Sequence, residues 1–470
     1  MVRFGYVVEL RARSSQKHIR CVEDNHIKCV KIDRGIPEKK EINITEADRS
    51  RIKEISNMAT PEKIVEMNKR NIPFSPPDIT ELEIAEVADA LRSGWITTGP
   101  RTKQLEKNIA AWVGVNKCVC LNSQTACGEM ALRLLRIGPN DEVITCAYTY
   151  TASASVIDHV GAKIVMVDCQ KDSFLIDYDA VENAITEKTK AIIPIDLGGV
   201  PCDYERLYKI VEKKKDLFKP SNEIQEKLGR VAICADCAHS FGASRGGVMA
   251  GNLADFSSFS FHAVKNFTTA EGGALTWKTI PGVDDEELYH QAQLYSLHGQ
   301  NKDALAKTKL GSWEYDVVGT WYKCNMTDIM ASIGLKQFER YPELLDERRR
   351  TNEKYDAAFK PLGIEVVPHY TDAYISTGHL YLARVPGITD EQRREIIVRI
   401  AEEGIATNVH YKPLPMHTAY KKLGFDIKDY PNSYERYLNL ITLPNHTLME
   451  DEDVEYVIGK FTEIIKEYLK

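Results

Sequence analysis

Short apolar runs alternate with longer segments of helical character between residues 105 and 278, and this alternation constrains the fold more than any other feature. Ten or more residues separate each run from the next. Parallel strands joined by helical crossovers produce such spacing. The sequence therefore predicts an α/β domain with a mainly parallel sheet covered by helices on both faces. The runs are CVCL (118–121), EVIT (142–145), KIVMVD (163–168), AIIPID (191–196), VAICAD (231–236), FSSFSF (256–261) and GALTW (273–277).

The pattern changes beyond Asn325 and predicts a second, smaller α/β domain. A charged helix near 343–360 precedes three apolar runs that we interpret as strands, and the last helix has apolar positions at helical spacing. We expect a large domain over 67–340, a small C-terminal domain over 341–470, and an N-terminal extension over 1–66 without visible chemistry. The three predicted strands are IEVV (364–367), HLYLARV (379–385) and ATNVHY (406–411).

Composition excludes several classes of protein. The formal charge of −7 arises from 68 acidic and 61 basic residues, and no basic block is suited to a nucleic acid backbone. Eleven cysteines lack the paired spacing of a zinc site, so no metal is expected, and their odd number suits a reducing compartment. No apolar stretch approaches the roughly 20 residues of a membrane span, and no secretion signal is visible. We expect a cytoplasmic protein.

Polar residues follow the predicted strands at the sheet edge where open α/β sheets bind their ligands. The segment around Thr125 and Ala126 starts a predicted helix, where free N–H groups could bind a phosphate, although such residues also serve as ordinary N-caps. Asp236 ends an apolar strand, and a buried carboxylate there needs a cation such as a protonated pyridine nitrogen. Taken alone, Asp236 also fits a helix cap.

Two further positions complete the pattern. Lys265 follows the run FSSFSF, and burial there would favour the neutral amine that forms Schiff bases. Tyr150 follows the EVITCA strand, where its ring could stack on a flat heteroaromatic ring or simply pack in the core. A phosphate-binding turn, a stacking ring, an acidic partner and a reactive lysine are together the elements that pyridoxal 5′-phosphate requires.

With these segments in place, the sequence from about Asn71 to the C-terminus resembles the sugar aminotransferases named for DegT, DnrJ and StrS. They are fold type I pyridoxal phosphate enzymes with a large cofactor-binding domain and a smaller α/β domain. The segments that carry the resemblance include SGWITTGP (93–100), GPNDEVIT (138–145), DCAHSFGA (236–243), SFHAVKN (260–266), AEGGA (270–274), KCNMTDIMASIGL (323–335) and ATNVHYKPL (406–414).

The resemblance assigns roles to individual residues. Lys265 would hold the cofactor as a Schiff base, Asp236 would pair with the pyridine nitrogen, and His239 would lie near the ring hydroxyl. Thr125, Ala126 and Ser260 would contact the phosphate, with Tyr150 over the ring. Asn325 would reach the phosphate of a neighbouring subunit, which implies a homodimer. The substrate-binding residues would be Thr98, His410 and Tyr411.

The implied activity is transfer of an amino group from glutamate, with release of 2-oxoglutarate, to a nucleotide-linked keto-sugar, expected to be a 4-keto-sugar, with a 3-keto-sugar as the alternative. Three alternatives stay open: a sugar dehydratase, which in this family has histidine in place of the lysine; a cofactor-binding regulatory protein without turnover; and an amino-acid or decarboxylating enzyme. Two departures from the family pattern, Asp196 in PIDLGG and the missing Trp before the His of STGHL (376–380), are expected near the substrate.

Overall fold

The computed structural model describes residues 7–9, 18–22, 28–32, 70–301 and 314–469. It separates into two compact units, Met1–Lys69 and Arg70–Lys470. In the first unit, three strands form an antiparallel sheet in the order β1-β2-β3. The rest of the predicted extension, 1–66, lies outside the described residues. The three strands are β1 (Val7–Glu9), β2 (His18–Val22) and β3 (Lys28–Ile32).

A seven-stranded sheet forms the centre of the second unit, in the order β4-β12-β11-β8-β7-β5-β6. Only β12 runs antiparallel to its neighbours, so the predicted mainly parallel sheet is confirmed. Every predicted run of the large domain forms one of these strands. They are β4 (Cys118–Leu121), β5 (Glu142–Cys146), β6 (Lys163–Val167), β7 (Thr189–Ile193), β8 (Ala232–Asp236), β11 (Phe256–Ser260) and β12 (Gly273–Trp277).

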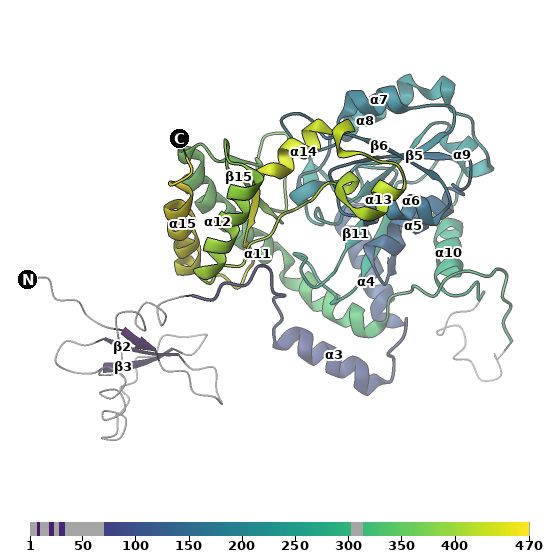
Figure 1. The fold of residues 1–470 in the computed structure, drawn as a ribbon. Helices are drawn as coiled ribbons and strands as arrows, with labels where there is room; N and C mark the ends of the chain where they lie inside the picture. Colours follow the sequence, from purple (N-terminus) through teal and green to yellow (C-terminus); the bar gives the residue numbers. More distant parts are fainter. Residues whose placement is uncertain (1–6, 10–17, 23–27, 33–69, 302–313, 470) are drawn as a thin grey trace, which may run out of the picture. The chain divides into compact units, whose positions relative to one another are not determined.

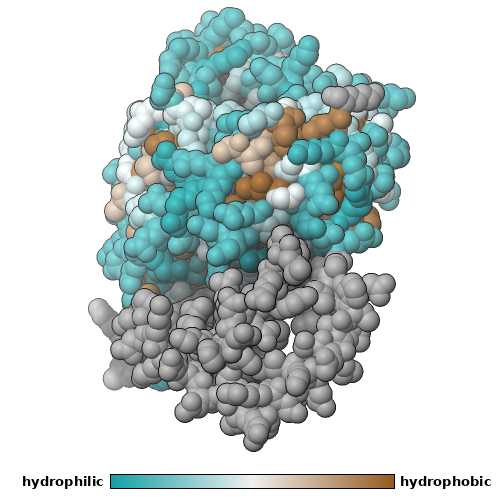
Figure 2. Space-filling model, turned by 90° about the vertical axis from the view of Figure 1, so that its left-hand side faces the viewer, coloured by the Kyte–Doolittle hydropathy of each residue, from teal (hydrophilic) through white to brown (hydrophobic). Residues whose placement is uncertain are grey.

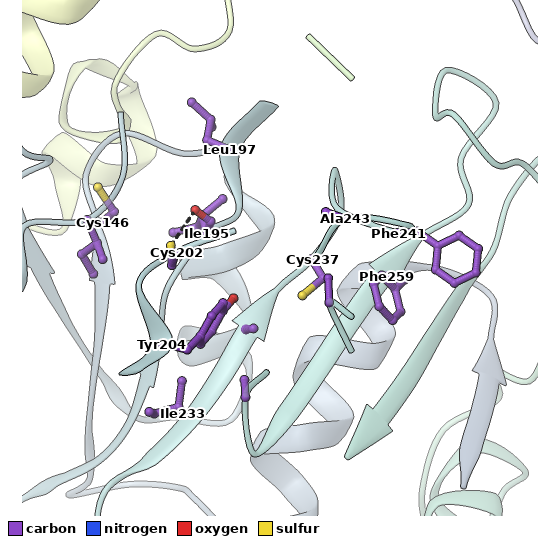
Figure 3. Packing of buried hydrophobic residues seen from close by; sticks show 14 of the residues in the cluster. Cys146, Ile195, Leu197, Cys202, Tyr204, Ile233, Cys237, Phe241, Ala243 and Phe259 are labelled. Carbon is purple, nitrogen blue, oxygen red and sulfur yellow. Dashed lines mark hydrogen bonds between the residues drawn. The ribbon is translucent and has the colours of Figure 1, made fainter. Parts of the chain in front are cut away.

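Helices cover both faces of this sheet (Figure 1). Successive side chains of a strand point to opposite faces. In β8, Ile233 and Ala235 accordingly pack in one core, and Ala232 and Cys234 in the other. Figure 3 shows part of the first core, where the thiol of Cys202 donates a hydrogen bond to the carbonyl of Ile195. Helices α4 (Pro100–Val113), α7 (Tyr178–Ala184) and α8 (Tyr204–Lys213) contribute to the first core, and α5 (Gln124–Leu134), α6 (Ala152–His159) and α10 (Asp285–Ser296) to the second.

A smaller three-stranded sheet with its own apolar core follows the long helix α11 (Asp328–Phe359). This helix starts well before the predicted residue 343 and runs through the expected domain boundary at residue 340. The predicted strand over 406–411 is wrong. This segment makes only an isolated bridge from Asn408 to Thr442, and the third strand is formed by β16 instead. The elements are β13 (Glu365–Val366), β15 (Tyr381–Arg384), β16 (Leu440–Leu443), α12 (Asp390–Glu402) and α15 (Asp451–Ile465).

The remaining elements are short, apart from α3, which packs on α11, and three of them form a further antiparallel sheet in the order β10-β9-β14. The face of the molecule in Figure 2 is mostly hydrophilic with small hydrophobic areas. In the part of the chain that the structure describes, no helix combines the length and apolarity needed to cross a membrane. These elements are α3 (Glu81–Ser93), α9 (Glu223–Leu228), α13 (Thr418–Lys422), α14 (Pro431–Leu438), β9 (Ser244–Arg245), β10 (Val248–Met249) and β14 (Tyr374–Ile375).

Candidate active site

A cavity of about 490 Å³ lies where β8 and β11 end. Residues of the C-terminal part of the chain, which also forms the small sheet, line it as well: His379, Leu380, His410, Tyr411, Leu443 and Asn445. Parallel strands of an open sheet bring their carboxyl ends to one edge, which is why residues far apart in sequence meet here. Eight of the predicted site residues line the cavity: Thr125, Tyr150, Asp236, His239, Ser260, Lys265, His410 and Tyr411.

Asp236 is the last residue of β8, and its side chain is buried. Burial raises the pKa of its carboxyl group, whereas hydrogen bonds from Ser153 and the Ala238 N–H, and the charge of Lys265, lower it. The Ser153 hydroxyl donates to Oδ2 at 2.6 Å and the Ala238 N–H donates to Oδ1 at 3.1 Å. Asp236 is therefore a held, desolvated carboxylate that would gain from a cation in the cavity.

Lys265 lies in the loop between β11 and β12, where its N–H donates to the carbonyl of His262 at 2.9 Å. Burial lowers the pKa of its amine from 10.5 to about 8, although the nearby Asp236 carboxylate opposes this shift. About a tenth of the amine is thus neutral at pH 7, far more than at an ordinary lysine, and only the neutral amine attacks a carbonyl carbon. Lys265 has the chemistry that a Schiff-base lysine needs.

The start of α5 forms the part of the cavity wall expected to bind phosphate. Ser123 is an N-cap that accepts from the Ala126 N–H at 3.1 Å, so the capping interpretation holds for this serine. Among the described residues, the N–H groups of Gln124 and Thr125 have no acceptor. A Cβ at Gly273 would come within 2.6 Å of the Gln124 nitrogen, so glycine lets β12 pass close to this turn. Free N–H donors at a helix start suit a phosphate group.

His239 is buried and connects three parts of the chain. Its Nδ1 accepts from the Gly198 N–H at 3.2 Å, and its Nε2 lies 3.1 Å from the hydroxyl oxygen of Tyr411. The His379 ring packs 4.6 Å away. Burial, followed by the charges of Lys265 and His410, lowers the pKa of His239 well below its usual value, so this histidine is neutral.

Two further predicted residues that line the cavity, His410 and Tyr150, each lie against a neighbouring aromatic ring. His410 stacks on Phe74 with ring centroids 5.4 Å apart, and its Nδ1 lies 3.1 Å from the Thr442 hydroxyl oxygen. Burial lowers the pKa of His410 to about 3. The Tyr150 side chain is 59% exposed and its ring lies 5.8 Å from that of Tyr411, so the core-packing alternative does not hold for this tyrosine.

Three predicted residues do not line the cavity. Ala126 follows the residues that do, and its N–H is bonded to Ser123. Asn325 and Thr98 contact each other instead, since the Asn325 amide donates to the Thr98 hydroxyl at 2.6 Å. The predicted contact of Asn325 with a neighbouring subunit therefore remains a prediction.

The expectation that Asp196 lies near the substrate is wrong. Ile195 lines the cavity, and the next side chain along the chain points into the core. The Asp196 carboxylate accepts from the Cys202 N–H at 2.8 Å, the Tyr204 hydroxyl at 2.8 Å and the Ser240 hydroxyl at 2.7 Å. It braces the loop that carries His239. In STGHL, by contrast, His379 and Leu380 do line the cavity.

Sequence reasoning missed Ser153 and His379 as site residues. Ser153 lies in a run of small residues with no distinctive spacing, so nothing in the sequence singles it out. His379 stood in a segment already expected near the substrate. Its Nδ1 lies 2.7 Å from Oδ1 of Asn266, the residue after the Schiff-base candidate Lys265.

Comparison with known proteins agrees with this geometry. The model of the DegT/DnrJ/EryC1/StrS aminotransferase family matches residues 77–462. The chain belongs to this family. Pyridoxal phosphate, predicted from the sequence, is confirmed as the cofactor of these aminotransferases, and the held Asp236 carboxylate, the Lys265 amine and the free N–H groups of α5 fit it.

Individual relatives cover the same part of the chain. The spore coat polysaccharide biosynthesis protein SpsC of Bacillus subtilis is 36% identical over 409 residues, which are 85% of this chain and 99% of SpsC. The putative sugar aminotransferase Spr1654 of Streptococcus pneumoniae, solved in its PMP-form, is 57% identical with a TM-score of 0.83, covering 85% of this chain and all of Spr1654. Its PLP-form is 55% identical over the same shares, with a TM-score of 0.82. The predicted fold and the aminotransferase class are confirmed.

Proposed function

We propose that this sugar aminotransferase moves an amino group from glutamate to a nucleotide-linked 4-keto-sugar and so makes an amino sugar for polysaccharide or glycoside biosynthesis. One observation carries the proposal: the Lys265 amine, with its lowered pKa, shares a 490 Å³ cavity with the buried carboxylate of Asp236. Amino transfer with pyridoxal phosphate requires an amine that reacts with the cofactor's aldehyde and an anion that keeps its ring nitrogen protonated.

Bound pyridoxal phosphate supplies an aldehyde that captures amines and a ring that withdraws electrons from the adjacent carbon. The chain's own residues do the rest. Asp236 would hold a proton on the ring nitrogen, and Gln124, Thr125 and Ser260, which line the same cavity, would bind the phosphate group. The Lys265 amine would accept at Nζ the proton that leaves the donor's α-carbon and would return it to the carbon that receives the amino group. Tyr150 would lie over the cofactor ring.

The sugar specificity rests on the relatives and on the cavity. SpsC bears a name that refers to polysaccharide biosynthesis, and Spr1654 is described as a sugar aminotransferase. His410 and Tyr411 line the cavity and follow Asn408, which bridges to Thr442 of the small sheet; this position supports the proposal that they contact the sugar.

A homodimer with shared sites and a cytoplasmic location complete the proposal. Asn325 lies outside this chain's own cavity lining, where its amide donates to the Thr98 hydroxyl, and the family resemblance supports a contact with a neighbouring subunit's phosphate. Nine cysteines among the described residues are unpaired, as expected in a reducing compartment.

The test is the visible absorption of the purified protein with pyridoxal phosphate, before and after addition of glutamate, followed by nucleotide-linked keto-sugars. Loss of the visible band with glutamate and its return with a 4-keto-sugar, together with an aminated product, would support the function. A band that glutamate leaves unchanged would favour the binding-only alternative. Release of a deoxygenated sugar without an amino group would identify a dehydratase instead.

A further inference from the structure

Tyr411 is fixed firmly in the cavity wall. Its backbone N–H donates to the Tyr148 hydroxyl at 3.0 Å, and that hydroxyl donates to the carbonyl of His410 at 3.2 Å. Tyr148 is completely buried, so this bridge does not depend on solvent. The Tyr411 ring packs between those of Tyr150 and His239, at 5.8 and 6.2 Å. The position of the Tyr411 hydroxyl is therefore set by the fold before any ligand arrives.

The hydrogen bonds of His239 decide where the Tyr411 proton points. Because the Gly198 N–H donates to Nδ1, that nitrogen has no proton, and a neutral imidazole then has its proton on Nε2. The Nε2–H group donates to the Tyr411 oxygen, 3.1 Å away. The phenol is consequently an acceptor toward His239, and its own O–H is left to donate elsewhere. Among the described residues, no acceptor for this proton is present.

The groups around the hydroxyl keep it protonated. Burial raises the pKa of Tyr411, and the charge of the Asp236 carboxylate raises it further. His239 and His410 are neutral, so neither favours the phenolate. The free O–H thus lies in the cavity that Lys265 also lines, as a donor without a partner.

We propose that the Tyr411 hydroxyl, positioned by His239, donates a hydrogen bond to an oxygen atom at the reacting end of the bound ligand. This inference rests on the proposed function. Two oxygens share the required chemistry: the ring oxygen of the cofactor, and the carbonyl oxygen of the keto-sugar. A donor held in place before the reaction stabilises negative charge at either oxygen without any reorganisation.

The first arm of the test uses the Tyr411→Phe variant loaded with pyridoxal phosphate and no substrate. Its visible absorption is titrated with pH beside the wild type. If the acceptor is the ring oxygen, loss of the donor destabilises the anionic oxygen. The pH midpoint of the absorption change then rises by about one unit. If the acceptor is the substrate carbonyl, the midpoint stays unchanged. Tyr434→Phe, at an exposed tyrosine of α14, is the matched control and should leave the midpoint in place.

The second arm measures each half-reaction separately in rapid-mixing experiments. If the acceptor is the keto-sugar carbonyl, Tyr411→Phe slows the reaction of the amine-loaded enzyme with keto-sugar by roughly 10²–10³-fold. The reaction with glutamate should change by less than about threefold in that case. Unfolding temperatures of variant and wild type within a few degrees show that the change is local, since phenylalanine keeps the ring.

The outcomes separate the inference from the function beneath it. An unchanged midpoint together with unchanged half-reaction rates overturns the inference, even if the wild type is an active aminotransferase. A wild type that turns over no keto-sugar refutes the proposed function, and the inference then depends on the midpoint alone. A raised midpoint supports the ring oxygen, and a selective loss of the keto-sugar reaction supports the carbonyl oxygen.

Discussion

The Ser153 hydroxyl on α6 donates to Oδ2 of Asp236 at the end of β8, at 2.6 Å. This hydrogen bond links the buried carboxylate of Asp236 to helix α6, which covers one face of the central sheet. Replacing the carboxylate by an amide in Asp236→Asn keeps the shape but removes the charge that would hold a proton on the cofactor ring. We expect kcat to fall about 100-fold, the range for losing a hydrogen bond to a charged group.

Ser153→Ala should lower kcat about tenfold, because Asp236 keeps its charge but loses one donor. Ser155→Ala on the same helix is the control, since among the described residues that hydroxyl donates only to the carbonyl of Ala152. Equal effects of the two serine variants in steady-state assays would contradict the proposed role of Ser153.

Lys265→Ala should abolish the Schiff-base absorption band and lower turnover by at least about 10³-fold, because no other lysine among the described residues lines the cavity. Lys209→Ala on α8 removes an exposed amine that pairs with Glu205 and should leave both properties unchanged. Appreciable steady-state turnover by Lys265→Ala would rule out this lysine as the base.

The lowered pKa of Lys265 predicts a pH-dependent stability in the cofactor-free protein. Its amine has a pKa of about 8 when folded and 10.5 when unfolded, so the unfolded chain binds more protons between these values and stability rises with pH there. Below pH 8, burial of the protonated amine lowers the free energy of unfolding by about 3 kcal/mol. Lys265→Met should therefore be more stable than the wild type at pH 7, and the advantage should disappear by about pH 10.5. Urea unfolding of both proteins across this range measures it, and a pH-independent difference would contradict the shifted pKa.

The turn that carries Glu271 to the cavity contains a strained residue. Ala270 has a φ of 69°, in the left-handed region that costs an alanine about 1 kcal/mol. Ala270→Gly should raise the free energy of unfolding by roughly 0.5–1 kcal/mol, because glycine adopts this φ freely. Ala263→Gly, in the preceding part of the same loop, should lower it by a similar amount through the greater freedom of the unfolded chain. Denaturant unfolding of both variants provides the comparison.

The expected role of Asn325 predicts complementation between subunits. Lys265→Ala and Asn325→Ala should each be inactive alone. In mixed dimers one of the two sites would have both residues intact, so a random mixture should regain about a quarter of wild-type activity. Mixing carried out under conditions that exchange subunits, followed by activity assays, decides this. A mixture without activity would mean that each site is built from one chain.

Much of the site could be predicted because its residues lie next to strong local signals. Asp236 and Lys265 follow apolar runs, and the ends of such strands share one edge of the sheet. The strand over 406–411 was predicted from the same kind of run and is wrong. There the His410 N–H donates to the Thr442 side chain, at 3.2 Å, in place of a strand partner. A run of residues suited to a strand does not reveal whether a neighbouring strand is available to it.

The α/β fold and the family could be predicted from residue types and their spacing along the chain, and the same signals singled out Lys265 and Asp236 as candidates for the Schiff-base lysine and its acidic partner. The neighbours that hold these two residues could be found only in three dimensions. Ser153 meets Asp236 across 83 positions, and Tyr411 meets His239 across 172. Asp196, one residue from the cavity-lining Ile195, faces the core instead. Such contacts depend on the direction of each side chain after the sheet and the two cores have formed, and the spacing of residues along the chain does not reveal that direction.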